Sequence, residues 1–199
     1  MQWLVLGLIL FLGVHSVRIV ADDWRQQTID RIGLGAWKAL YSLLSAVGLV
    51  LIVWGYGLAR QTPVVLWNPP LGMRHAASLL TLLAFVLLVA AYVPGNALKQ
   101  RWQHPMVLGV KLWALAHLLA NGTLADVLLF GGFLAWAVLD FRAARQRSAA
   151  TPSTDDEDAE DRTTPSTAAT VATVVVGVAA WAVFAFWAHA ALMGVRPFG

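Results

Sequence analysis

Six long apolar stretches, each close to the length of a membrane-spanning helix, dominate this sequence of 199 residues. They lie at residues 2–20, 37–58, 75–93, 106–121, 123–141 and 169–192. A transmembrane helix needs about 20 consecutive, mostly apolar residues. The composition agrees, because 59% of the residues are hydrophobic and only 13% are charged. The sequence therefore predicts an all-α fold, a polytopic membrane helix bundle of about six transmembrane helices with the lipid bilayer as its surroundings.

Basic residues between the apolar stretches predict the orientation of the bundle. Cytoplasmic loops of membrane proteins carry an excess of lysine and arginine. The connecting segments expected on one side hold ten such residues, against three on the other side. The ten are Arg18, Arg25, Arg31, Lys38, Lys99, Arg101, Arg142, Arg145, Arg147 and Arg162. We therefore expect both termini outside the cytoplasm, and no nucleic-acid binding, since loop charge explains the basic surplus.

Residues 142–168 differ from the rest of the chain, because they are rich in Ala, Ser, Thr, Pro and acids and offer little to bury. This composition predicts a disordered acidic cytoplasmic linker, and a solvated tether is favoured over an acidic docking tail. The expected organisation is a five-helix transmembrane domain at 1–141, the linker, and a final transmembrane helix and tail at 169–199. The chain has no cysteine, which excludes disulfides, thiolate metal ligands and catalytic thiols.

Two histidines, His15 and His117, lie inside apolar stretches, where an ionisable side chain is costly and so indicates a function. Arg18 lies one turn from His15, and Lys111 lies on the cytoplasmic side of His117. Two imidazoles with cations on one side suit a b-type haem with axial histidines and cytoplasm-facing propionates. The alternatives are a hydrogen bond between helices for the histidines and extension to the lipid headgroups for the two cations.

The residues around His117 favour the approach of a flat group. Trp113 and Asn121 lie one turn away on the same helix, and Ala114 and Ala120 are its small neighbours. Close packing of helices would select small residues as well. The other three histidines, His75, His104 and His189, lie near the ends of apolar stretches and are expected to be interface residues.

Three motifs resemble the NnrU family of bacterial membrane proteins. They are HPMVLGVKLWALAHLLANG at 104–122, FLGVHSVR at 11–18 and WNPP at 67–70. The resemblance covers about residues 1–141. It implies a multi-pass protein of the bacterial inner membrane that is linked to nitrite and nitric-oxide metabolism in denitrification.

The NnrU family is in turn similar to the zeta-carotene isomerase, a membrane enzyme with haem b. This similarity implies that His15 and His117 are the iron ligands and that His104 matches a further histidine of that enzyme. Ala114 stands where the isomerase has a cysteine, so a thiolate cannot replace a ligand here. The implied role is redox chemistry with a redox partner, or cis-trans isomerisation of an apolar substrate. Whether the chain is an enzyme stays open, and no catalytic residue is assigned.

The candidate haem-binding residues are therefore His15, His117, Arg18, Lys111, Trp113, Asn121 and His104. A second resemblance gives an alternative, because HPMVLG is similar to the RHPxYxG segment of membrane methyltransferases that use S-adenosylmethionine. Gln103 and Val107 replace the arginine and tyrosine of that segment. A third interpretation is an accessory membrane subunit without a cofactor, in which both intramembrane histidines join helices.

Overall fold

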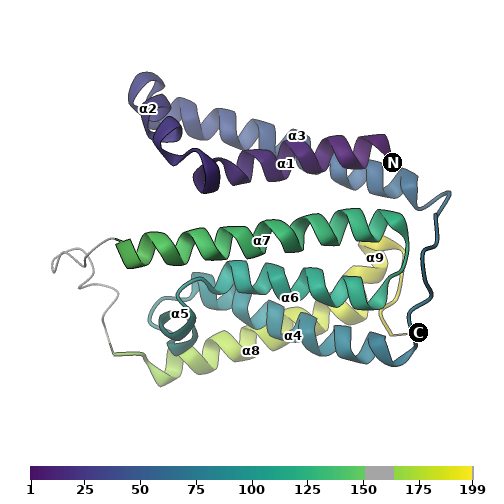
Figure 1. Ribbon diagram of the computed structural model, residues 1–199. Helices are drawn as coiled ribbons and strands as arrows, with labels where there is room; N and C mark the ends of the chain where they lie inside the picture. The colour runs from purple at the N-terminus through teal and green to yellow at the C-terminus, as the bar shows by residue number, and fades with distance from the viewer. Residues whose placement is uncertain (151–163, 199) are drawn as a thin grey trace. The chain divides into compact units, whose positions relative to one another are not determined.

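The computed structural model describes residues 1–150 and 164–198, and all of its longer elements are helices (Figure 1). They are α1 (Gln2–Val20), α2 (Asp22–Ile32), α3 (Leu34–Ala59), α4 (Gly72–Tyr92), α5 (Ala97–Trp102), α6 (Pro105–Ala120), α7 (Leu124–Ala150), α8 (Thr167–Val183), the π-helical turn η1 (Phe184–Ala188) and α9 (His189–Met193). This architecture confirms the predicted all-α class.

Five helical segments in the described part of the chain are long and apolar enough to cross a membrane. These are α1, α3, α4, most of α7, and the continuous run of α8, η1 and α9 over Thr167–Met193. The sixth predicted span, α6, is apolar but only 16 residues long. Large apolar side chains such as Ile9, Val50 and Val53 are about two-thirds exposed, as expected of side chains that face lipid. The helices therefore form a multi-pass membrane protein.

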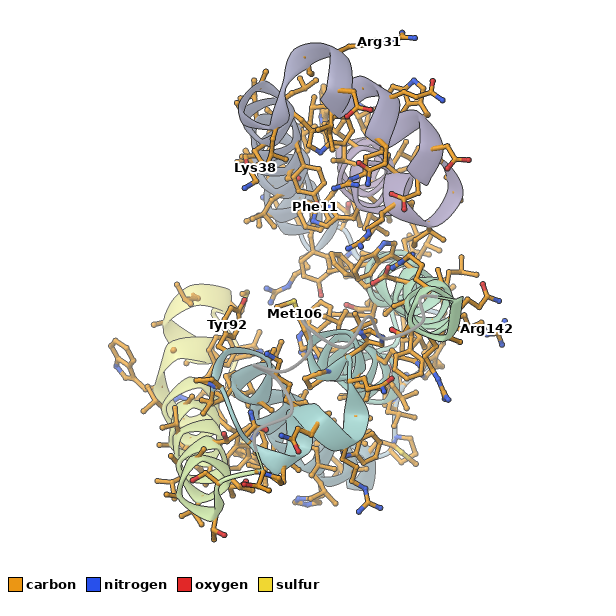
Figure 2. All side chains as sticks on the ribbon, turned by 90° about the vertical axis from the view of Figure 1, so that its left-hand side faces the viewer. Phe11, Arg31, Lys38, Tyr92, Met106 and Arg142 are labelled. Carbon is orange, nitrogen blue, oxygen red and sulfur yellow. The ribbon has the colours of Figure 1, made fainter. Side chains whose placement is uncertain are left out.

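The connecting segments are more helical than the sequence predicted. The charged region after α1 forms α2, in which Asp22 and Arg25 lie 3.4 Å apart as an ion pair. Figure 2 shows Arg31, near the end of α2, and Lys38, near the start of α3. Helix α7 continues past residue 141 to Ala150, because Ala, Arg and Gln favour helix there. The linker predicted at 142–168 therefore starts with helix, and 151–163 lie outside the described residues.

The chain divides into two compact units. The first consists of Met1–Asn68 and Asn121–Asp140, and the second of Pro69–Ala120 and Phe141–Gly199. Helix α7 contributes its first part to the first unit and its C-terminal part to the second.

Close contact between α1 and α3 organises the first unit (Figure 1). Glycines make this contact possible, because a Cβ atom on Gly55 would lie 2.3 Å from the backbone nitrogen of Leu4, and one on Gly7 would lie 2.6 Å from that of Ile52. Leu4 is fully buried in the contact. Small residues let membrane helices approach until their backbones touch, which increases van der Waals packing where no hydrophobic effect drives association.

The turn before α7 is fixed by hydrogen bonds in the first unit. The backbone nitrogen of Leu66 donates to the carbonyl of Gly122 at 2.8 Å. The buried Asp126 carboxylate accepts hydrogen bonds from the hydroxyl of Tyr56 at 2.5 Å and from the backbone nitrogen and hydroxyl of Thr123 at 3.0 and 2.6 Å. Thr123 and Asp126 thus cap the start of α7. The backbone nitrogen of Trp67 donates to the same Gly122 carbonyl at 3.2 Å, so the start of the WNPP segment meets the Asn-Gly end of the long motif.

The second unit is built on α4, which contacts both α6 and α8. A Cβ atom on Gly177 of α8 would lie 2.7 Å from the Cα atom of Val86, and the indole nitrogen of Trp181 donates to the hydroxyl of Thr81 at 3.2 Å. The start of α8 is also held, because the backbone nitrogen of Ala97 donates to the hydroxyl of Thr170 at 3.0 Å. The last helix is therefore an integral part of the second unit.

Candidate functional site

His15 is held in one orientation by its own helix. Its Nδ1 atom lies 2.7 Å from the carbonyl oxygen of Phe11, one turn earlier in α1. A neutral imidazole has one N–H, so a ring that donates from Nδ1 carries its lone pair on Nε2. The phenyl ring of Phe11 stacks on the imidazole, with 4.2 Å between ring centroids. The local helix thus presents the Nε2 atom of His15 as an acceptor or metal ligand.

Aromatic side chains from three helices surround His15. Tyr41 of α3 lies 5.2 Å from it between ring centroids, and Trp136 of α7 meets it edge-on at 6.0 Å. Phe133, one turn before Trp136, lies 5.7 Å from Phe11. These rings place the imidazole in apolar surroundings within the first unit.

Two buried polar atoms lie on α3 and α7, the helices that bring Tyr41 and Trp136 to His15. The indole nitrogen of Trp136 and the hydroxyl of Ser45 are both buried, and neither has a hydrogen-bond partner within residues 1–150 and 164–198. Ser45 lies one turn after Tyr41 on α3. Buried polar groups are normally satisfied, so both atoms have bonding capacity that the described residues do not use.

His117 repeats the local arrangement of His15 on α6. Its Nδ1 atom lies 2.8 Å from the carbonyl oxygen of Trp113, one turn earlier, and the two rings lie 5.2 Å apart between centroids. Ala114 and Ala116 beside it are fully buried. The tautomer that donates from Nδ1 again has Nε2 as its ligand atom. His15 belongs to the first unit and His117 to the second.

Of the other candidate residues, Lys111 and His104 lie in the second unit, and Arg18 and Asn121 lie in the first. In the second unit, the ammonium of Lys111 lies 4.2 Å from the centroid of the Phe141 ring, and His104 meets the same ring edge-on at 6.1 Å. The structure thus brings together Lys111 and His104. Arg18 lies in the last turn of α1, and Asn121 directly follows α6.

In the described ranges 1–150 and 164–198, the remaining histidines and the acidic residues form no second centre. His75 is exposed on α4, and the Nδ1 atom of His189 lies 2.7 Å from the carbonyl oxygen of Val195. Among the described residues, no three His, Asp or Glu side chains gather as a metal-ion site. Haem is a different case, because the porphyrin supplies the equatorial ligands and the protein only the axial ones.

Sequence reasoning missed Tyr41, Ser45 and Trp136. Ser45 carries a signal, since a hydroxyl in the middle of an apolar stretch is a polar residue inside the membrane. Tyr41 and Trp136 carry no such signal, because aromatic residues are frequent throughout this chain. Only the packing of α1, α3 and α7 identifies them as neighbours of His15.

Comparison with known protein families gives a match over nearly the whole chain. A family model described as NnrU protein matches residues 3–197. The match continues past residue 141, where the resemblance seen in the sequence was expected to end, and includes α8. No curated protein and no solved structure matches the chain.

Proposed function

The chain belongs to the NnrU family, and from this starting point we propose that it is a haem b protein of the bacterial inner membrane with His15 and His117 as axial iron ligands. Its best-supported role is one-electron redox chemistry linked to nitrite or nitric-oxide metabolism. If both histidines hold the haem, electron transfer would need neither of them to leave. Isomerisation of an apolar substrate would require one histidine to dissociate.

The observation that carries this proposal is the shared orientation of the two intramembrane histidines. Each has its Nδ1 atom against the carbonyl oxygen four residues earlier, at 2.7 Å for His15 and 2.8 Å for His117. Histidines that bind metals usually donate their second ring N–H to a carbonyl or carboxylate, which fixes the tautomer and makes the ligand nitrogen more basic. Both side chains are therefore preorganised to ligate through Nε2.

The surroundings of the two histidines fit the apolar macrocycle of a haem. Phe11, Tyr41 and Trp136 line the imidazole of His15, and buried alanines flank His117. These side chains would exclude water from the ligand nitrogens, while the helix carbonyls hold the proton on Nδ1. When bound, the haem supplies a reversible one-electron couple, and the protein sets its potential through the axial ligands and the polarity around them.

An absorption spectrum of the detergent-purified protein tests the proposal, with cells supplied with a haem precursor. We expect one haem per chain, with a Soret band that sharpens on dithionite reduction and a low-spin pattern in both states. A colourless protein that also fails to take up added haemin would overturn the proposal. S-adenosylmethionine binding or a cofactor-free accessory role would then be the remaining interpretations.

The proposed orientation places both termini outside the cytoplasm, on the basis of the loop charges. The absence of cysteine makes a direct test simple, because a single cysteine introduced at Gln2 or Arg196 has no competitor in the chain. We expect both positions to react with a membrane-impermeant maleimide in intact spheroplasts, and a cysteine at Lys99 to react only after lysis. Labelling of Lys99→Cys alone in intact spheroplasts would reverse the orientation.

A further inference from the structure

Cationic side chains from two helices of the second unit gather around Phe141. The ammonium of Lys111 on α6 lies 4.2 Å from the ring centroid, and the guanidinium carbon of Arg145 on α7 lies 6.0 Å from it. His104, directly before α6, meets the same ring edge-on. Arg142 follows Phe141 in the chain, and its charge acts on Lys111. These five residues are called the Phe141 cluster below.

The Phe141 cluster holds three cationic side chains close together. Within the parts of the chain that the structure describes, none of Lys111, Arg142 and Arg145 forms an ion pair with a carboxylate. Like charges held close together repel each other, and the repulsion is strongest where the surroundings are least polar. Cation–π contact with the phenyl ring offsets part of this cost for Lys111 and Arg145. An anion placed among the three cations would offset more.

The position of the cluster along the helices indicates the kind of anion. The apolar stretch of α7 ends at Phe141, and Arg142 and Arg145 are exposed directly beyond it. Figure 2 shows Arg142 near this end of α7. Lys111 is the only lysine or arginine in α6, and its long side chain reaches toward the same ring. Charged heads beside an aromatic face at the end of a span match the boundary between hydrocarbon and headgroups.

We propose that Lys111, Arg142 and Arg145 bind the phosphate of an anionic phospholipid, with Phe141 against the lipid's glycerol and upper acyl region. Basic sites between transmembrane helices recognise anionic lipid headgroups. One guanidinium group can donate two parallel hydrogen bonds to two oxygens of a phosphate. The inference does not depend on haem binding. It assigns Lys111 to a lipid phosphate, in place of the haem propionate suggested by the sequence.

Native mass spectrometry of the detergent-purified full chain tests this site with phosphatidylglycerol and phosphatidylcholine as probes. We expect phosphatidylglycerol to bind preferentially to the wild-type protein. Each cation near a membrane surface contributes enough attraction to change affinity by about fivefold. The double variant Lys111→Gln with Arg145→Gln should therefore weaken phosphatidylglycerol binding by about 25-fold, with little effect on phosphatidylcholine. Lys111→Arg should retain binding because it keeps the charge.

A matched control removes the same charge elsewhere in the second unit, through Lys99→Gln with Arg101→Gln on α5. This control should change phosphatidylglycerol binding by less than about twofold if the site is specific. An equal loss in both double variants would overturn the proposal, because net charge alone would then explain the binding. Competition by millimolar inorganic phosphate would assign the site to free phosphate. Loss of haem with unchanged lipid binding would assign the cations to the propionates.

Discussion

Replacing His15 or His117 by alanine is expected to remove most of the haem from the purified protein. Each substitution deletes the proposed iron-ligating nitrogen, Nε2, of a ring whose Nδ1 atom contacts the carbonyl of Phe11 or Trp113. Loss of a partner that only orients a metal ligand already costs about 10- to 100-fold in affinity or activity. We therefore expect haem content per chain to fall at least about tenfold, or the remaining haem to become high-spin, as measured by pyridine haemochrome and absorption spectra.

His189→Ala is the matched control, because its Nδ1 atom also contacts a carbonyl oxygen, that of Val195, at an exposed position. It should keep the wild-type spectrum. Glycine variants at 15 and 117 extend the test, since added imidazole should enter the vacated space and restore the low-spin spectrum. Full haem content in His15→Ala and His117→Ala, with loss in His189→Ala, would show that the ligand assignment is wrong.

Gly55→Ala is expected to be the most damaging conservative substitution in the contact between α1 and α3. The added methyl group would lie 2.3 Å from the backbone nitrogen of Leu4 and 2.7 Å from the carbonyl carbon of Trp3. Backbone atoms cannot rotate away as a flexible side chain can, so the two helices must separate. Overpacking of this kind costs about 1–3 kcal/mol, and we expect the upper end of that range. Unfolding in mixed detergent and dodecyl sulfate micelles measures the change in the free energy of unfolding.

Gly57→Ala provides the control, because it makes the same chemical change two residues along α3, where a Cβ atom meets nothing within 4 Å. It should alter the free energy of unfolding by no more than about 0.5 kcal/mol, and alanine's better helix propensity favours a small gain. Equal effects of the two substitutions would mean that helix propensity, and not the contact with α1, determines stability at this position.

The sequence determined which helices are long and apolar enough to cross a membrane. An apolar run of sufficient length can satisfy its backbone groups in lipid only as a helix or within a closed barrel, and this explains why α1 has the predicted bounds of Gln2–Val20. The local orientation of both intramembrane histidines is also a property of the helix, since the carbonyl one turn earlier is within reach of Nδ1. The sequence did not predict α2 or the extension of α7, because short charged helices lack an apolar signal.

Only the tertiary structure decided which helices are neighbours. In lipid, apolar side chains do not distinguish another helix from the surrounding acyl chains, so hydrophobicity gives no information about partners. The partners follow from close fits, such as Gly55 against Leu4 and Gly177 against Val86. The same packing brings Trp136 to His15 over a separation in the chain that no sequence pattern marks. The sequence thus determined that the two histidines lie within long apolar helices. The packing of one helix against another determined which side chains surround them.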